Sequence, residues 1–250
     1  QGSNCWSSLK RAAGRISYAD DAVTKRLEKG MANLIHHNTA SFLRFVERFI
    51  AGEEVHKVEA NKTYAIMLYY ALFQDKISKT GYESINEALE LIHLPKYACF
   101  KQEIAEIVSY LLSRLDIKTT PIGAEIIPGL ELYGCYTREA VFTLVGRQTA
   151  EVKMQGAASG AFNLPEHNAV LLFVTLNKSE KDFSPSTQYN DYLINENYFH
   201  WQSKNTDSHY NSGGRKYIEQ SKTGINIILF VREEKKDGFG NTSPFHCFGL

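Results

Sequence analysis

The spacing of apolar residues changes character about halfway along this chain, and that change restricts the architectures it can adopt. In the first half, side chains such as Phe42, Phe45 and Phe49 recur every three or four positions, which is the period of one helix face. In the second half, apolar residues form short unbroken runs rich in β-branched and aromatic types, most clearly over 170–176 and 225–231. The pattern predicts a helical half followed by a β-rich half.

Local start signals agree with the helical period. Asn38 is suited to cap a helix that begins at Thr39, and residues 84–87 have the spacing of a capping box. Pro95 fits the first turn of a helix that continues to Arg114. We expect about five or six helices, packed as a small bundle.

A segment with two prolines and two glycines, residues 116–129, separates the halves. We therefore predict two domains with a boundary near residue 125. The first is a helical bundle over 1–125, and the second is a β-rich domain over 126–250.

The second domain is expected to consist of strands joined by long polar loops. Residues 192–203 and 245–248 have strand composition, whereas one helix is expected over 137–146, with Thr137 as its cap and Gly146 as its stop. Because little helix separates the strands, a mainly antiparallel sheet is favoured over a doubly wound one. The predicted fold class is α+β, a helical bundle followed by a mainly antiparallel β-domain, for which a pseudobarrel is one available form.

The charge balance and the absence of common motifs restrict the function. With 28 Lys and Arg against 28 Asp and Glu residues, any nucleic-acid site must be a local basic patch. The phosphate loop of ATPases, dinucleotide fingerprints and common hydrolase motifs are absent, so no catalytic residue is assigned. Four scattered cysteines and eight histidines without ligand spacing predict no metal and no cofactor. His36 and His37 are instead expected to end a helix, where a cation interacts favourably with the dipole.

No run approaches the roughly 20 apolar residues that cross a bilayer, and the start does not resemble a secretory signal. We expect a soluble, cytoplasmic protein without a membrane partner. The chain begins Gln1-Gly2-Ser3 and lacks an initiator Met, so we expect it to be a piece of a longer protein.

The most unusual segment is residues 189–217, which interleaves seven aromatic residues with amides, hydroxyls and cations. Such a mixture supplies flat faces for base stacking, amides for base edges and charges for phosphates. The candidate phosphate contacts are Lys204, Arg215 and Lys216, and the candidate base contacts are Tyr198, His200, Gln202 and Asn205.

A structural interpretation of the same segment places Phe199 and Trp201 in the core. Tyr198, His200 and Gln202 then line a solvent face, and residues 205–214 form a turn-rich loop. Spacing alone favours this second interpretation.

The segment also allows a different chemistry. One class of Mg²⁺-dependent nucleases places an Asp before one strand and a Glu/Gln-x-Lys on the next, which here would be Asp191, Gln202 and Lys204. Glutamine is a poor ligand for a hard cation, so this signal is weak.

Several segments of the second half, in this order and spacing, are similar to one family. They are 172–181, 183–184, 189–192, Phe199-His-Trp-Gln-Ser203, 229–233 and Phe245-His-Cys-Phe-Gly249. The family is the uncharacterised domain carried C-terminal to the motor of bacterial superfamily 2 (DEAD/DEAH-box type) helicases, some of which bear a phospholipase D-like nuclease domain. The helical half, with residues 6–9 and 136–139, looks like the segment that joins motor and terminal domain.

The resemblance implies that the parent protein is an ATP-dependent helicase, whose motor motifs this chain lacks. Related helicases often belong to restriction or phage-defence systems, and by analogy a terminal β-rich domain there reads DNA. The predicted function is a non-catalytic nucleic-acid recognition module, with DNA favoured and the helicase motor of the same parent chain as a further partner. The alternatives are a Mg²⁺-dependent nuclease domain and a protein-interaction or autoinhibitory module that docks on the motor.

Overall fold

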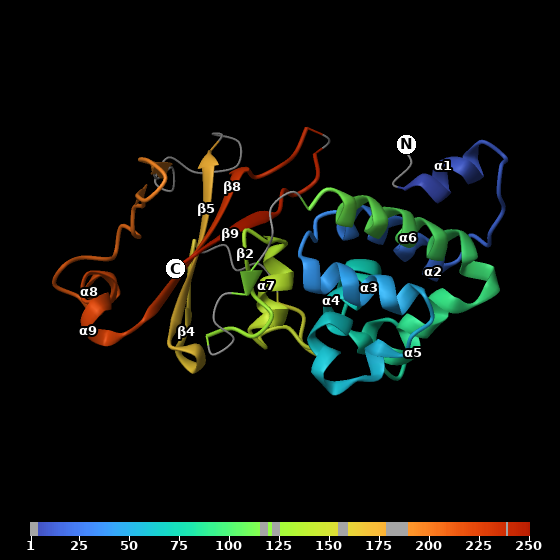
Figure 1. Cartoon of the computed structure of the whole chain (residues 1–250), viewed down its shortest axis with the longest axis horizontal. Coiled ribbons are helices and arrows are strands. Elements are labelled where there is room, and N and C mark those ends of the chain that lie inside the picture. The colour runs from blue at the N-terminus through green and yellow to red at the C-terminus, as the bar shows by residue number, and fades with distance from the viewer. Residues whose placement is uncertain (1–4, 116–119, 122–125, 155–159, 179–189, 239) are drawn as a thin grey trace.

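The structure of the chain is a computed structural model, which describes residues 5–115, 120–121, 126–154, 160–178, 190–238 and 240–250. The N-terminal region is helical and the C-terminal region contains a five-stranded sheet, so the α+β class is confirmed. Figure 1 shows the helical region on one side of the molecule and the sheet on the other.

The helical region consists of α-helices joined by short 3₁₀ turns. The α-helices are α1 (Trp6–Ala12), α2 (Ala22–Leu34), α3 (Ala40–Ile50), α4 (Lys62–Phe73), α5 (Ile85–Glu90) and α6 (Ala98–Ser113). The 3₁₀ turns are η1 (Val55–Lys57), η2 (Glu59–Asn61), η3 (Ile77–Lys79), η4 (Leu91–His93) and η5 (Pro95–Tyr97). Pro95 therefore opens the separate 3₁₀ turn η5 that leads into α6, which begins at Ala98, whereas the sequence predicted Pro95 in the first turn of the helix itself.

The predicted caps are confirmed in part at one helix, where the Glu87 carboxylate accepts from the Glu83 amide rather than from Ser84, and wrong at another. Ser84 caps α5 by accepting a hydrogen bond from the Glu87 amide at 3.1 Å. At α3 the cap residue is Thr39 rather than Asn38, and no side-chain cap bond is found at Thr39. The free amides at the start of α3 are bound instead by Glu131, far away in the sequence.

Helices α2 and α4 cross at Gly30. A Cβ built on Gly30 would lie 2.7 Å from the Leu72 Cα atom and 2.8 Å from the Leu72 carbonyl oxygen. Because no larger residue fits, the two helix backbones can approach closely only at a glycine. Helix α2 then ends at Leu34, and its C-cap Ile35 precedes the two histidines.

His36 and His37 do follow the end of a helix, but they are not cations there. The His36 amide donates to the Asn33 carbonyl and the His37 amide to the Leu34 carbonyl. Burial lowers the pKa of His37 to about 4, and burial also lowers the pKa of His36. Both rings are therefore neutral at pH 7, and the prediction of a favourable cation at the helix end is wrong because of burial.

The sheet has the strand order β3 (Cys135–Tyr136), β9 (Phe245–Gly249), β8 (Asn226–Glu234), β5 (Ala169–Asn177) and β4 (Ala161–Leu164). The β3/β9, β9/β8 and β5/β4 pairs are antiparallel, whereas β5 and β8 run parallel. Strands β3 and β4 are its edges, so this sheet is open, and the residues described form no closed barrel. A second, two-stranded sheet pairs β1 (Thr120–Pro121) with β2 (Glu131–Leu132).

Helix α7 (Arg138–Leu144) covers the face of the sheet toward the helical region, and η6 (Pro165–His167) joins β4 to β5. Thr137 caps α7 by accepting from the Ala140 amide at 3.1 Å, and Gly146 follows it with a φ of +71°. The predicted cap and stop of this helix are therefore confirmed.

Two parallel neighbours need a crossover connection, and residues 178–225 supply it. The described part holds a small hairpin of β6 (Tyr192–Leu193) and β7 (Phe199–His200), followed by α8 (Ser212–Ile218) and α9 (Gln220–Thr223). The single strand expected over 192–203 is therefore wrong, because a turn divides it. The sequence predicted one helix, over 137–146, in the whole second half. That prediction is also wrong, because α8 and α9 lie there in addition to α7.

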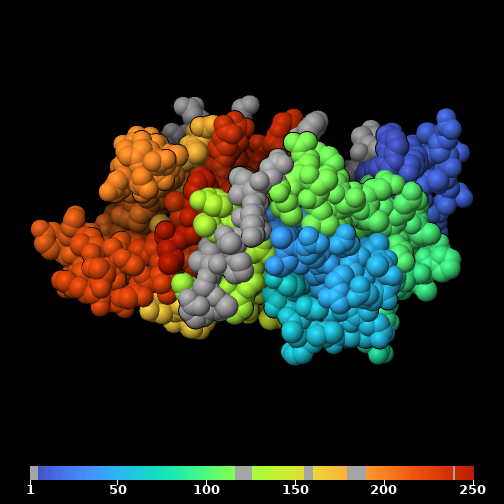
Figure 2. All heavy atoms as spheres, viewed as in Figure 1, coloured from blue at the N-terminus to red at the C-terminus, as the bar shows by residue number. Residues whose placement is uncertain are grey.

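One hydrophobic core continues from the helical region into the sheet. It contains Leu34 and Phe42 of the helices as well as Tyr136, Phe142 and Phe230 of the second half. In Figure 2 the yellow-green atoms around α7 lie directly against the blue atoms of the helical region. The boundary near residue 125 stays a prediction, and across it the two regions pack as one body.

The opposite face of the sheet is covered by the crossover. A smaller apolar cluster forms there from Val170 and Leu172 of β5, against which Trp201 and Tyr217 pack. In the described residues, no helix has the length and apolar character needed to cross a membrane.

Candidate nucleic-acid interface

The hairpin of β6 and β7 holds two aromatic rings face to face. Its antiparallel register places Tyr192 opposite His200. Their ring centroids are 4.7 Å apart and the planes differ by 11°, so the rings are stacked. In Figure 2 the hairpin is part of the orange lobe that projects at the upper left.

The hairpin and the loop after it expose tyrosine side chains to solvent. Tyr198, next to the hairpin turn, is 66% exposed, and Tyr210, in the loop before α8, is 94% exposed. Because an exposed ring leaves apolar surface in water, each offers a face that a base or another flat group can cover.

His200 is held in one tautomer by the backbone. Its Nδ1 atom lies 2.9 Å from the carbonyl oxygen of Asn190, and since a carbonyl only accepts, Nδ1 must carry a proton. In the neutral ring, Nε2 is then a hydrogen-bond acceptor. His200 is half-buried, so part of its surface remains accessible.

Gln202 is used by the chain itself. Its side-chain oxygen accepts from the backbone amide of Asn190 at 2.9 Å, and its backbone amide donates to Asp191 Oδ1 at 2.9 Å. The side-chain NH₂ of this exposed residue remains the group through which it would meet a base.

Asp191 forms a buried ion pair. Its Oδ2 atom lies 2.6 Å from Lys178 Nζ, and the two side chains are 4% and 9% exposed. Both carboxylate oxygens of Asp191 therefore have partners, one in Lys178 and one in the Gln202 amide. The pair links Lys178, directly after β5, to Asp191, the residue immediately before β6.

These contacts do not fit a Mg²⁺ site. A metal ion would have to displace the Lys178 ammonium from Asp191, and the oxygen of Gln202 faces a backbone amide. Within the described ranges, no group of three His, Cys, Asp or Glu side chains could hold a metal. In the described contacts, Asp191 accepts from the Lys178 ammonium and the Gln202 backbone amide.

The three candidate cations differ in their contacts. Lys204 is exposed, and the described contacts assign no partner to its side chain. Arg215 Nη2 pairs with Glu219 Oε1 at 3.0 Å, one helical turn along the chain. Lys216 is half-buried, and its Nζ donates to Asn163 Oδ1 at 2.7 Å. Lys216 therefore contacts the edge strand β4 of the sheet.

Electrostatic coupling places Lys204 near Lys216. Burial lowers the pKa of Lys216, while Asp207 raises it and Lys204 lowers it. The two lysines and Asp207 thus form one local charge cluster. Asn205, the remaining candidate, is exposed and lies in the same loop.

The loop before α8 depends on a glycine pair. A Cβ on Gly214 would lie 2.2 Å from the Ser208 carbonyl oxygen, and one on Gly213 would lie 2.5 Å from Asp207 Oδ1. The Asn211 side chain caps α8 by accepting from the Gly214 amide at 3.0 Å. The glycines therefore allow the loop that carries the exposed cation to fold back on α8.

The structural interpretation of the aromatic residues is confirmed for Trp201. Its ring packs on Tyr217 edge to face, with centroids 4.8 Å apart, against the outer face of the sheet. Tyr198 and Gln202 are exposed, as that interpretation also predicts. Trp201, directly after β7, therefore packs inward on the sheet, whereas the Tyr198 ring is exposed to solvent. Tyr189 and residues 179–188, which the sequence also singles out, lie outside the described residues.

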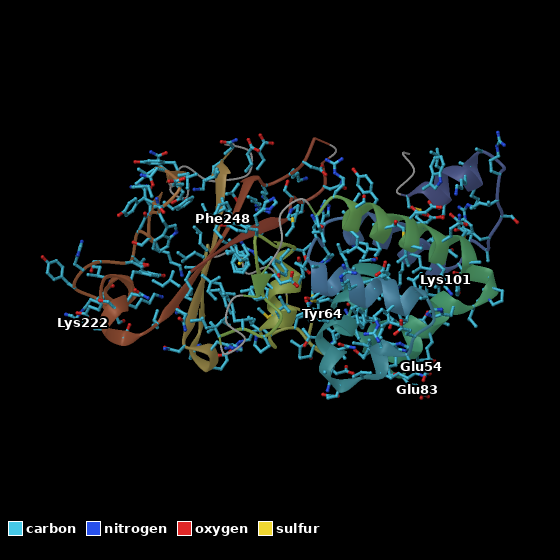
Figure 3. The ribbon with its side chains drawn as sticks, in the orientation of Figure 1. Glu54, Tyr64, Glu83, Lys101, Lys222 and Phe248 are labelled. Atoms are coloured by element: carbon cyan, nitrogen blue, oxygen red, sulfur yellow. The ribbon has the colours of Figure 1, made fainter. Side chains whose placement is uncertain are left out.

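Sequence reasoning missed the groups that hold the candidate side chains. Asn190 binds both His200 and Gln202, Asn163 binds Lys216, and Glu219 binds Arg215. Only Glu219 had a readable signal, because Arg215 and Glu219 have the i,i+4 spacing of a helix pair. Figure 3 shows Lys222 at the far end of the crossover and Phe248 at the sheet.

The comparisons with known proteins bear on the second half of the chain. No curated protein and no solved structure shows significant similarity to the chain. Residues 130–249, which include α7, the whole five-stranded sheet and the crossover, match the family model described as "Domain of unknown function (DUF3427)".

Proposed function

We propose that this chain is a non-catalytic nucleic-acid recognition module that binds a strand across the β6–β7 hairpin and the loop before α8. The observation that carries the proposal is the set of accessible rings in the same segment as an exposed lysine: the stacked pair of exposed Tyr192 and half-buried His200, the exposed Tyr198 and Tyr210, and Lys204. Stacking on rings and charge on phosphates together bind single-stranded nucleic acid with little sequence preference.

The contacts support different roles for the candidate residues. Tyr198 and the Tyr192–His200 pair provide stacking faces, and the amides of Gln202 and Asn205 meet base edges. Lys204 contacts a phosphate directly. Arg215 and Lys216 contribute to the local field but must first leave Glu219 and Asn163 to touch one.

The wider setting of the module rests on the resemblance described above. We propose that it acts in the cytoplasm beside the motor of an ATP-dependent helicase, in a restriction or phage-defence system, and delivers the motor to DNA. Support for this comes from the family-like segments between residues 172 and 249 alone.

Binding of labelled oligonucleotides, followed by fluorescence anisotropy, tests the proposal. Single-stranded DNA, duplex DNA and single-stranded RNA are compared at about 50 and 200 mM salt. Replacing Tyr198 with Ala removes one stacking face, worth about 1–3 kcal/mol, and should weaken binding about 5- to 150-fold. Lys204→Ala should lower the slope of log affinity against log salt by about one.

Matched controls come from the helical region. Tyr110, 53% exposed on α6, is replaced by Ala, as is the exposed Lys79 of η3. Both variants should bind like the unmodified chain. Equal affinities of Tyr198→Ala and Tyr110→Ala for every oligonucleotide would contradict the proposal.

A separate observation favours a second candidate function, docking on a protein partner. Leu193 and Ile194, both more than half exposed, lie in the same hairpin, and aliphatic side chains suit a protein partner better than a base. In this role the module docks on the motor. No oligonucleotide binding by the chain, together with a changed ATPase rate when the chain is added to the motor, would favour docking over recognition.

A further inference from the structure

A hollow of about 310 Å³, here called the outer pocket, lies between the outer face of the sheet and the crossover. Its floor is apolar and includes Leu172 of β5 and Leu229 of β8, which lie opposite each other in the parallel register. Phe199 of β7 and Trp201, directly after that strand, form an aromatic wall. Ligand pockets span roughly 300–1,000 Å³, so the outer pocket has room for a single ring system rather than for a length of strand.

Phe248 of β9 supplies a further aromatic wall, and an irregularity of the sheet positions it. Leu229 of β8 lies opposite Gly249, whereas the next residue of β8 lies opposite Cys247. Phe248 is therefore the extra residue of a β-bulge, a feature that re-aims a side chain. Phe248, labelled in Figure 3, is 44% exposed, so its ring is available to a ligand in the pocket.

The polar character of the outer pocket is that of amides rather than of charges. Of the described residues that line it, none has an ionisable side chain. Gln220 of α9 donates from Nε2 to the Ile225 carbonyl at 3.0 Å, which fixes the orientation of its amide. Its Oε1 atom, to which the described contacts assign no donor, remains an acceptor. A nucleobase can donate an N–H group to this oxygen, whereas an aliphatic side chain cannot.

The strand β7 carries both the proposed strand-binding surface and a wall of the outer pocket. Successive side chains of a strand point to opposite faces, so Tyr198 and His200 lie on one face while Phe199 and Trp201 line the pocket on the other. Lys204 follows Trp201 by three residues, so the two Cα atoms lie within about 11 Å of each other. A strand that contacts the outward rings and Lys204 therefore passes close to the pocket.

The walls and the neighbouring surface together indicate the ligand. Every base has a π face, so aromatic side chains stack on bases of any sequence. Turning a base away from its neighbours costs least in a single strand, where no partner base has to be given up. We infer that the outer pocket binds one nucleobase, turned in from the strand that crosses the hairpin. The inference rests on the proposed function, because the strand must lie along β7.

The fluorescence of Trp201 tests the inference in the whole chain. The sequence has two tryptophans, and Trp6→Phe, at an exposed position of α1, leaves Trp201 as the single reporter. Single-stranded oligothymidine and adenosine are titrated into this variant. A base that stacks in the pocket should lower the emission of Trp201, with adenosine acting at millimolar and oligothymidine at lower concentration. Unchanged emission at oligothymidine concentrations that saturate binding by anisotropy would overturn the inference.

Two variants assign the effect to the outer pocket. Phe248→Ala removes an exposed wall and should weaken oligothymidine binding at least fivefold. Gln220→Leu removes the acceptor and should weaken adenosine binding at least threefold. Tyr110→Ala, on α6, is the control and should change neither affinity. Affinities equal to the control in both pocket variants would refute the assignment, and Gln220→Leu keeps it testable if Phe248→Ala does not fold.

The same measurements separate a failure of the outer pocket from a failure of the hairpin. If Tyr198→Ala binds oligothymidine weakly while Phe248→Ala binds like the control, the hairpin recognises the strand and the pocket takes no base. If adenosine lowers the emission of Trp201 although no oligonucleotide binds, the pocket takes a base and the proposed strand recognition is wrong. A shift of Trp201 emission with N-acetylleucinamide, without any response to adenosine, would overturn the inference in favour of a protein side chain.

Discussion

The carboxylate of Glu131 accepts a hydrogen bond from the backbone N–H of Ser41 at 3.0 Å, although 90 positions separate the two residues. Its other oxygen accepts from the Ala40 amide at 3.2 Å. Glu131 thereby supplies the cap that α3 lacks locally. Beside it, Asn38 and Cys135 exchange two backbone hydrogen bonds. Polar contacts as well as a continuous core therefore join the helical region to the second half.

Replacing Glu131 with Ala should destabilise the whole chain. Glu131 itself is 2% exposed, and its loss leaves the Ala40 and Ser41 amides without this acceptor, at a cost of about 2 kcal/mol. Glu131→Gln keeps one acceptor oxygen and should cost about half as much. Urea unfolding measures both, with Glu47→Ala on the exposed face of α3 as the control. If the Ala variant unfolds at the same urea concentration as the control, the cap contributes nothing.

Much of the helical region was predictable because its signals are local. Helix α3 buries Phe42, Phe45 and Phe49 on one face, and their spacing alone reveals that face. The cap by Glu131 was not predictable, because nothing near either residue reports a partner so distant. The same holds for Glu103, whose carboxylate binds the amides of Trp6 and Ser7 at the start of α1.

The second half shows where local reasoning fails. Strands β5 and β8 were predictable from their apolar runs, but their parallel pairing depends on a crossover whose helices the sequence conceals. Helix α8 contains Gly213 and Gly214, which are typical of a loop, and the Asn211 cap is the one visible signal. At the candidate site, alternation predicted the exposure of Tyr198, whereas the burial of Asp191 against Lys178 required the fold.

Replacing Gly214 with Ala should displace the loop that carries Lys204. The new methyl group would collide with the Ser208 carbonyl oxygen, and overpacking of this kind costs about 1–3 kcal/mol. Gly238→Ala is the matched control, since a Cβ there meets no atom within 4 Å. Thermal unfolding and oligonucleotide binding are measured for both. Equal melting temperatures and equal affinities would show that the close approach of the two backbone segments is unimportant.

Stability should fall between neutral and acidic pH because of His37. Burial lowers the pKa of this ring in the folded chain to about 4, below the 6.5 of an ordinary histidine, so the unfolded chain takes up the proton first as pH falls. The contribution of His37 is complete above about pH 6.5 and declines by up to about 3 kcal/mol as the pH approaches 4.

Urea unfolding at a series of pH values measures this decline. The variant His37→Phe removes the titrating group next to the Phe42 ring and should flatten the dependence of the unfolding free energy on pH. His209→Asn, in the exposed loop before α8, should keep the original dependence. A His37→Phe variant whose stability still declines as steeply would assign the effect to other buried groups.

Asp191 should prove structural rather than catalytic. In Asp191→Asn the Gln202 amide keeps an acceptor, but Lys178 loses its buried counter-charge, which costs about 3 kcal/mol. Adding Lys178→Met removes the ammonium that lost its counter-charge, and the double variant should recover more than half of the lost unfolding free energy. Glu219→Gln, which breaks an exposed pair with Arg215, is the control and should change stability by less than about 1 kcal/mol.

Urea unfolding gives these energies, and incubation of plasmid DNA with Mg²⁺ tests the chemistry in the same variants. We expect Asp191→Asn to unfold at lower urea concentration and the plasmid to remain intact with every variant, because Lys178 and the Gln202 amide already occupy both carboxylate oxygens. Cleavage by the unmodified chain that Asp191→Asn abolishes, at unchanged unfolding free energy, would instead favour the nuclease alternative. It would require Lys178 to leave the carboxylate when the metal binds.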